Sequence, residues 1–261
     1  MALKTWQRMT AAGLLMVGGG AQAALVAYQA NGADLVYDDD YTPVGASSPG
    51  LTWTADANLF KTQYVADNTV VDQIIAAVPT VTDSNGDHPV VASDFNTTDW
   101  RMTWRGATAW VEWLGIIAYG GADDWRLWSA LNDDGSGPCG PAYDCADSEV
   151  GHLFYDEGNL TARQNITSSI TLTGIFMNVQ NTGYWSGTES SASGGWYFIT
   201  SDGSQSYTSK GLLNHAWAVR PGQITAAAPL PGTAGLMALG LLGLGAGRVG
   251  RQAILVIRSF G

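Results

Sequence analysis

The sequence predicts an α+β domain with two or three helices, an antiparallel β meander after them, and an apolar helix at the C-terminal end. Three observations predict this class. Apolar residues recur at helical spacing in the first half of the central region. Short aromatic or β-branched runs, separated by Gly, Ser and Asn, follow after Thr161. Both ends differ in composition from the centre. With 46% hydrophobic and 13% charged residues, the 261-residue chain can form a substantial core.

The first 23 residues have the pattern of a secretory signal peptide. Lys4 and Arg8 precede the apolar stretch Met9–Val17, and an A-x-A cleavage site follows at residues 21–23. Three consecutive glycines before this site argue against a buried N-terminal helix. We therefore expect residues 1–23 to be removed on export and the mature domain to comprise residues 24–225.

Three helices are predicted before the meander. The first has apolar residues at positions i, i+1, i+4, i+5 and i+8, which lie on one helical face. Each helix has a polar residue that can cap its start, and Pro or Gly at its end. The predicted limits are Asn68 to Pro79, Thr103 to Gly120, and Asp147 or Ser148 to Gly158.

The meander is predicted from four short runs, which are Tyr184–Thr188, Trp196–Thr200, Gln205–Thr208 and Ala216–Arg220. Side chains alternate between the faces of a strand, so Trp196 and Phe198 should share one face and Tyr197 the other. By the same alternation, Trp217 and Val219 should lie opposite Ala216, Ala218 and Arg220. The rings expected mainly in the core are those of Trp185, Trp196, Phe198 and Trp217.

Polar or amphipathic side chains of the meander are the expected ligand contacts. Tyr offers both an apolar ring and a hydroxyl group, which suits recognition at a partly wet surface. The predicted contact residues are Tyr184, Glu189, Tyr197, Gln205, Tyr207 and Asn214.

Cys139 and Cys145 are the only cysteines, and an exported chain meets an oxidising compartment. A metal site is the alternative, but two cysteines without a neighbouring His cannot complete a zinc shell. We therefore predict a disulfide that closes a short loop.

Oxygen-bearing side chains imitate the 1, 3, 5, 12 spacing of a calcium loop at Asp83, Asn85, Asp87 and Asp94. Position 6 is His88, where the tight turn of such a loop requires Gly. We interpret these residues as solvated acidic turns, with calcium as the alternative, and expect no other cofactor.

The charge of the chain excludes one class of partner. Residues 24–225 contain seven basic and 23 acidic side chains, which gives a net charge of −16. Such a surface repels phosphate backbones, so we expect no nucleic-acid partner.

The segment 226–261 contains a short apolar stretch, Ala234–Gly247, whose 14 residues are fewer than the ~20 of a membrane-spanning helix. The segment resembles a PEP-CTERM sorting signal through Pro229, Pro231, Gly232, Thr233, Arg248 and Arg251. This resemblance implies recognition by an exosortase-type enzyme and transient or permanent membrane insertion. It also implies a bacterial host that makes extracellular polysaccharide. The two arginines are spaced, whereas the family has a tight basic cluster.

Seven blocks occur in order along the central region: DLVYDDD (34–40), LTWTADAN (51–58), RMTWRGATAW (101–110), YGGADDWRL (119–127), SEVGHLFY (148–155), YWSGTE (184–189) and AWAVRPG (216–222). The series resembles the Lcl C-terminal domain family, which implies a C-type-lectin-like fold for residues 24–225.

Together these resemblances imply an exported, non-catalytic binding module at the cell surface, in the outer envelope or in an extracellular matrix. Its expected ligand is an extracellular polysaccharide, another surface glycan or a matrix component. A net charge of −16 repels sulfated polyanions, so a neutral or calcium-bridged glycan is favoured. The alternatives are a passive structural protein without a ligand and an enzyme on the formylglycine-generating type of fold.

No catalytic residues are expected. His88, His152 and His215 lack metal-ligand spacing, and a G-x-S-x-G nucleophile elbow is missing from the sequence. The enzymes on the related fold depend on reactive cysteines in their C-terminal half, whereas both cysteines here lie in a mid-chain loop. His152 is expected to be structural.

Overall fold

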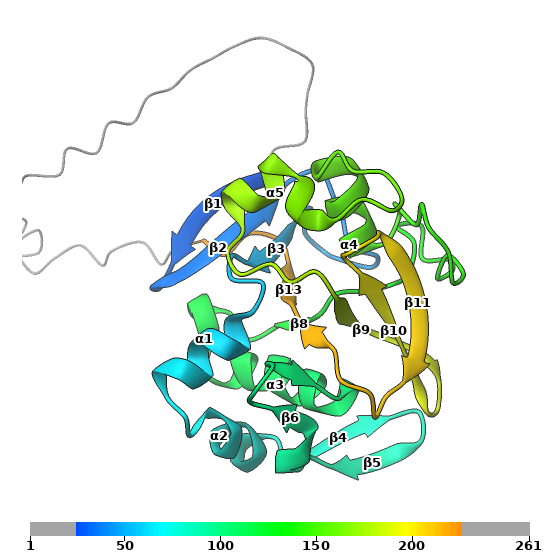
Figure 1. The fold of residues 1–261 in the computed structure, drawn as a ribbon. Helices are drawn as coiled ribbons and strands as arrows, with labels where there is room; N and C mark the ends of the chain where they lie inside the picture. Colours follow the sequence, from blue (N-terminus) through cyan, green and yellow to red (C-terminus); the bar gives the residue numbers. More distant parts are fainter. Residues whose placement is uncertain (1–24, 226–261) are drawn as a thin grey trace, which may run out of the picture. The chain divides into compact units, whose positions relative to one another are not determined.

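The structure is a computed structural model that describes residues 25–225, and it is of the predicted α+β class (Figure 1). The signal-peptide region and the apolar segment lie outside the described residues. So do the sorting residues Pro229, Pro231, Gly232, Thr233, Arg248 and Arg251, and the predictions for these segments stay predictions. Within residues 25–225, no helix is long and apolar enough to cross a membrane.

The larger sheet has five antiparallel strands in the order β1-β2-β3-β13-β8. Their bounds are β1 Leu25–Ala30, β2 Ala33–Asp38, β3 Leu51–Thr54, β13 Ala218–Pro221 and β8 Arg126–Leu127. Val219 of β13 pairs with Trp53 on one side and with Arg126 on the other. The last strand of the domain therefore holds its N-terminal strands and β8 in one sheet.

The second sheet has the strand order β11-β10-β9-β12. Its strands are β9 Gly183–Ser191, β10 Gly194–Ile199, β11 Ser204–Ser209 and β12 His215–Ala216. Strands β9, β10 and β11 form an antiparallel meander, as predicted.

The prediction of one strand over residues 216–220 is wrong. The chain leaves the second sheet after β12, which runs parallel to β9, and enters the larger sheet as β13. Trp217 lies at this change of sheet, where its indole Nε1 donates to the carbonyl of Thr54 at 2.9 Å. Its ring also packs edge-on against Phe176 at 4.9 Å. These contacts hold Trp217 against β3 and against Phe176 at the point where the chain changes sheet.

Two short hairpins complete the β structure. They are β4 Thr80–Asp83 with β5 Gly86–Pro89, and β6 Phe95–Asn96 with β7 Arg101–Met102.

Five α-helices lie within residues 25–225, with short 3₁₀ and π turns between them. Their bounds are α1 Leu59–Ala66, α2 Val70–Ala77, α3 Trp104–Ile116, α4 Glu149–His152 and α5 Ile170–Ile175. The other helical turns are η1 Ala92–Asp94, η2 Tyr119–Gly121, η3 Leu153–Glu157 and η4 Ile166–Ser168. The three predicted helices correspond to α2, α3 and α4 with η3.

The predicted caps are confirmed at two helices and wrong at the third. The hydroxyl oxygens of Thr103 and Ser148 accept from backbone N–H groups of α3 and α4, at 3.1 and 3.2 Å. At α2 the N-cap is Thr69 rather than Asn68. The carboxylate of Asp67 accepts from the backbone N–H of Thr69 and orders this turn instead.

The buried residues of the described chain form two hydrophobic cores. The first core contains residues of α1, α2 and α3, and the second contains residues of α4, η3 and α5. Trp196 and Phe198 lie in the second core while Tyr197 packs against the first, which confirms the predicted alternation. Trp217 and Val219 likewise lie in the second core, and Ala216 and Ala218 in the first. The four rings predicted for the core, Trp185, Trp196, Phe198 and Trp217, are all buried.

Candidate functional site

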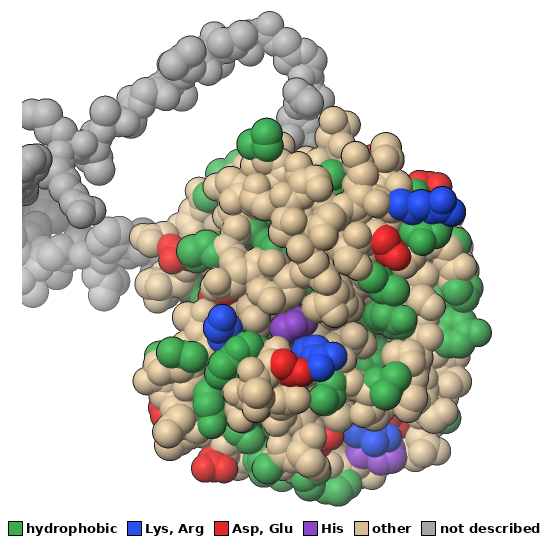
Figure 2. All heavy atoms as spheres, in the orientation of Figure 1, with side chains coloured by type: hydrophobic (Ala, Val, Ile, Leu, Met, Phe, Trp, Pro, Cys, Tyr) green, Lys and Arg blue, Asp and Glu red, His purple; other side chains and the backbone are tan. Residues whose placement is uncertain are grey.

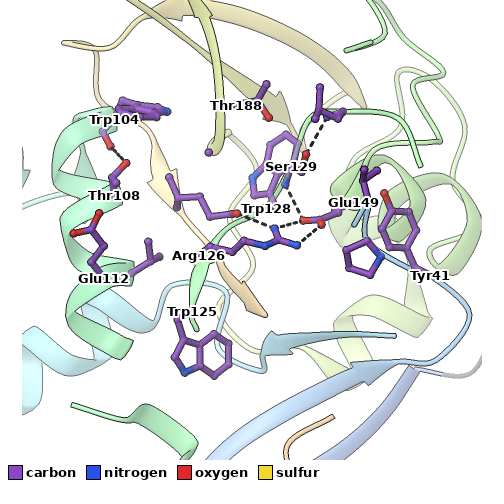
Figure 3. Close-up of a pocket in the computed structure, with 16 residues that line it drawn as sticks. Tyr41, Trp104, Thr108, Glu112, Trp125, Arg126, Trp128, Ser129, Glu149 and Thr188 are labelled. Carbon is purple, nitrogen blue, oxygen red and sulfur yellow. Dashed lines mark hydrogen bonds and ion pairs between the residues drawn. The ribbon is translucent and has the colours of Figure 1, made fainter. Parts of the chain in front are cut away.

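A cavity of about 450 Å³ opens beside α3 (Figure 3). Its walls come from α3, from the chain that follows Tyr41, from β8 with the residues after it, and from β9. We call it the tryptophan pocket. Its lining residues are Tyr41, Pro43, Val44, Trp104, Thr108, Val111, Glu112, Trp125, Arg126, Leu127, Trp128, Ser129, Leu131, Glu149, Gly187 and Thr188.

One wall is a stripe along α3. Trp104, Thr108, Val111 and Glu112 occupy positions i, i+4, i+7 and i+8, so they share a helical face. The indole Nε1 of Trp104 donates to the carbonyl of Ser186 in β9 at 2.8 Å and fixes the ring against that strand. Desolvation raises the pKa of Glu112. The stripe therefore presents a large ring, a hydroxyl group and a carboxyl group to the cavity.

The floor of the pocket contains an ion pair between Arg126 and Glu149, which lies between the α3 wall and Tyr41 in Figure 3. The two guanidinium nitrogens of Arg126 donate to the two oxygens of Glu149, at 2.8 and 2.6 Å. The backbone N–H of Ser129 donates to the same carboxylate at 2.7 Å. Burial alone would lower the pKa of Arg126, but the charge and hydrogen bonds of Glu149 outweigh it and raise that pKa. The arginine is thus a cation already neutralised by its partner.

The polar ends of three aromatic side chains are held by backbone carbonyls. Besides the bond of Trp104, Trp125 Nε1 donates to Tyr119 at 2.8 Å and the Tyr41 hydroxyl donates to Asp147 at 3.0 Å. Trp128 differs, because its Nε1 is buried without a hydrogen-bond partner. Rings held in this way present fixed apolar surface to a ligand.

Apolar and aromatic walls with a few placed polar groups are typical of small-molecule sites. The only basic residue in the lining is Arg126, which is paired, while Glu112 has no ion-pair partner among the described residues. The pocket therefore suits an uncharged ligand that has both apolar surface and hydroxyl groups.

The structure corrects two of the predicted contact residues. Tyr184 and Gln205 are both 0% exposed, so neither can lie on a contact surface. The Tyr184 hydroxyl accepts from the backbone N–H of Gln180 at 2.8 Å, and Gln205 Nε2 donates to the carbonyl of Cys139 at 3.2 Å. Protein packs on both faces of the meander at these two positions, so both side chains are enclosed.

Glu189 is a partly exposed member of an ion network around a buried lysine. The ammonium group of Lys210 lies 2.9 Å from a Glu189 oxygen and 2.8 Å from an Asp83 oxygen, and this lysine is only 2% exposed. Burial alone would raise the pKa of Asp83, but the hydrogen bonds and charge of Lys210 lower it to about 2. Glu189 and Asp83 therefore hold a buried lysine.

The calcium-loop spacing is not realised as a loop. Asp83, Asn85 and Asp87 belong to the β4–β5 hairpin, whereas Asp94 ends η1. Asp87 accepts from the Thr82 hydroxyl at 2.6 Å, and Asp94 accepts from the Thr103 hydroxyl at 2.7 Å. Residues 80–83 pair with residues 86–89 in this hairpin, and this pairing takes the place of a calcium-binding loop.

The structure brings two of the predicted contacts together. Tyr197 and Asn214 line a second cavity of about 480 Å³, along with Arg101, Thr208 and residues 211–213. Tyr207 is 53% exposed but lies on the opposite face of the meander, with its ring 5.2 Å from that of Trp196. The six predicted contacts therefore do not form one site.

The predicted disulfide is present between Cys139 and Cys145. It closes the loop beside β11, where the backbone of Ala142 pairs with Gln205.

The tryptophan pocket was missed as a site because its residues come from segments far apart in the sequence. The helical spacing of Trp104, Thr108 and Glu112 places these residues on one face of α3, but that spacing alone does not indicate a pocket. Nothing in the sequence pairs Arg126 with Glu149, because tertiary folding brings these residues together.

No family model matches this chain, and comparisons with curated proteins and with solved structures return no match.

Proposed function

We propose that this chain is an exported, non-catalytic binding module that holds a neutral saccharide in the tryptophan pocket. The observation that carries the proposal is the lining of that pocket, where the side chains of Trp104, Trp125 and Tyr41 surround a neutralised Arg126–Glu149 pair. The pocket of about 450 Å³ is within the size range of small-molecule sites.

A saccharide ring fits these walls chemically. Its C–H faces can pack on the rings of Trp104 and Trp125, while its hydroxyl groups can bond to Thr108 and Glu112. An unionised ligand also avoids repulsion by the net charge of −16 carried by residues 24–225. Charged side chains are few and scattered on the face drawn in Figure 2.

The same proposal includes the finer fold and the location. It takes residues 24–225 as a C-type-lectin-like domain of the Lcl C-terminal type, and residues 226–261 as a PEP-CTERM-like tail processed by an exosortase-type enzyme. The Cys139–Cys145 disulfide supports an oxidising compartment, such as the cell surface, the outer envelope or an extracellular matrix.

The test is a glycan array with a pocket-filling variant. Gly187 lines the pocket, and a Cβ added there would meet Leu127 and Trp128 atoms only at 3.5 to 3.8 Å, which are ordinary contacts. Gly187→Ile should therefore fold and block the cavity. Gly174→Ile is the matched control, because a Cβ at Gly174 meets nothing within 4 Å and this residue lies outside the pocket lining.

We expect the unmodified chain and Gly174→Ile to bind the same neutral glycans, and Gly187→Ile to lose at least tenfold in affinity. If the chain binds no glycan on the array, the passive structural role replaces the proposal. Equal binding by all three proteins would move the site away from the tryptophan pocket.

A further inference from the structure

Four ionisable side chains converge at the end of β2, outside the tryptophan pocket. Asp38 is the last residue of β2 and Asp40 follows it, while His152 ends α4 and Glu157 ends η3. Each offers one ligand atom, and the four atoms all lie within 4.8 Å of one another. Two segments more than 100 residues apart in the chain thus meet around one point.

Two of the carboxylates are buried and incompletely paired. Asp38 is 1% exposed, and the side chain of Glu157 is 3% exposed. Asp38 Oδ2 and Glu157 Oε1 have no hydrogen-bond partner, yet they lie 3.7 and 3.8 Å from His152 Nε2. Buried polar atoms are nearly always hydrogen-bonded, so these two oxygens indicate that a cation is their partner.

Each of the other buried carboxylates of the described chain is satisfied by a basic side chain or by hydrogen bonds. Asp83 is paired with Lys210, and Glu149 is paired with Arg126. Asp56 has no cation but uses both oxygens in hydrogen bonds, for example with the backbone N–H of Asn58. Asp38 and Glu157 face only the imidazole of His152 among the described cationic groups.

His152 is oriented in the way that metal-binding histidines are. Its Nδ1 lies 3.2 Å from an oxygen of Asp156, so an Nδ1–H donated to that carboxylate leaves the Nε2 lone pair free. Nε2 lies 3.2 Å from Asp40 Oδ1 and 3.7 to 3.8 Å from the other two carboxylates. In a tetrahedral zinc site with bonds of ~2.1 Å, ligand atoms are about 3.4 Å apart.

The cluster is open to cations from solvent. Asp40, His152 and Asp156 line a cavity of about 680 Å³, together with Asp133, Asp134 and Asp147. The lining of this cavity contains no Lys or Arg. Clefts lined by one sign of charge concentrate ions of the opposite sign.

We propose that Asp38, Asp40, His152 and Glu157 bind a divalent transition-metal ion of the zinc class. Three carboxylate oxygens and one imidazole nitrogen suit zinc, whereas calcium takes six to eight oxygen ligands. The ion ties the end of β2 to α4 and η3. Tyr41, Pro43 and Val44 line both this cavity and the tryptophan pocket, so the ion also holds the chain segment that the two share.

The test uses zinc alone with the purified full chain, stripped of metal by a chelator. Calorimetry and elemental analysis should give one zinc per chain, bound more tightly than calcium. We expect His152→Gln to weaken zinc binding at least 100-fold and Glu157→Gln at least tenfold. Asp134→Asn is the matched control, because Asp134 lines the same cavity outside the cluster, and it should bind zinc as the unmodified chain does.

X-ray absorption at the zinc edge is measured on the unmodified chain, so its result does not depend on whether a variant folds. It should show one nitrogen and three oxygen ligands from the protein. The proposal is overturned by less than stoichiometric zinc, by zinc binding that His152→Gln leaves unchanged, or by tighter binding of calcium. The readout is metal content, so its failure is distinct from failure of the saccharide proposal.

Discussion

Arg126 and Glu149 meet in a two-point ion pair, with nitrogen–oxygen distances of 2.6 and 2.8 Å, on the floor of the tryptophan pocket. Residue 126 belongs to the larger sheet and residue 149 begins α4, so the pair joins the sheet to a helix of the second core. The pair therefore links the shape of the pocket to the stability of the domain.

Replacing Glu149 should destabilise the domain. Glu149→Gln leaves the guanidinium of Arg126 without its counter-charge and weakens the bond from the Ser129 backbone N–H. Because the Arg126 side chain is 34% exposed, we expect a loss near the lower end for such pairs, about 3 kcal/mol in urea unfolding. Asp124→Asn, in the exposed pair with Arg220, should cost under about 1 kcal/mol. Equal losses for both variants would contradict this account.

The meander allows a comparison of two stacked rings. Trp196 is buried in the second core, whereas its neighbour Tyr207 is mostly exposed. Trp196→Ala should cost about 3–5 kcal/mol because it leaves a cavity. Tyr207→Ala should cost about 1 kcal/mol, since it removes mainly the edge-on ring contact. Thermal unfolding of both variants checks the order, and a larger loss for Tyr207→Ala would reverse our assignment of core and surface.

Acid should destabilise the protein through His215. Burial, with the charge of Arg101 second, lowers the pKa of His215 to about 4, below its ordinary value near 6.5. The neutral ring is favoured in the folded state, so this contribution is complete above pH 6.5. It is lost as the pH falls toward 4, because the unfolded chain takes up the proton first. The total is roughly 3 kcal/mol.

The measurement is urea unfolding of the unmodified chain and of His215→Asn between pH 7 and pH 4. Subtracting the variant removes contributions common to both proteins, such as those of carboxylates that do not interact with His215. The difference in unfolding free energy should shrink as the pH falls. A difference that stays constant over this range would show that His215 is not buried in its neutral form.

The disulfide should stabilise the domain by limiting the unfolded chain. A loop closed between Cys139 and Cys145 contributes about 2 kcal/mol by the chain-entropy relation. Cys139→Ser with Cys145→Ser should lower the urea midpoint accordingly, and the unmodified chain should lose the same amount under reducing conditions. Two free thiols in mass spectrometry of the unreduced protein would contradict the bond.

Much of the fold could be predicted because local signals agree with it. Thr103 and Ser148 are side-chain caps that can be recognised from sequence, and the alternation at residues 196–198 follows from strand geometry. Helix α5 was missed because its only buried residue is Leu172, which leaves no apolar stripe to detect. Helix α1 buries only its first two residues, so it lacks a stripe as well.

The sites could not be predicted in the same way. Tyr184 and Tyr207 both lie in predicted strands and have the same side chain, so the sequence does not distinguish them. Tertiary packing buries Tyr184 in the second core and leaves Tyr207 exposed. His152 was expected to be structural, and no local pattern indicates that Asp38 and Glu157 would lie beside it. Contacts between distant segments determine both sites.

The most direct test of the central claim is the indole N–H spectrum of the chain, labelled with ¹⁵N, during titration with the neutral glycan that binds best on the array. The signals of Trp104 and Trp125 should shift and saturate together, because these residues line the pocket. Those of Trp53 and Trp217 should stay in place, because neither residue lines the pocket and both are fully buried in the second core. Saturable shifts confined to other tryptophans, with the signals of Trp104 and Trp125 unmoved, would contradict saccharide binding in the tryptophan pocket.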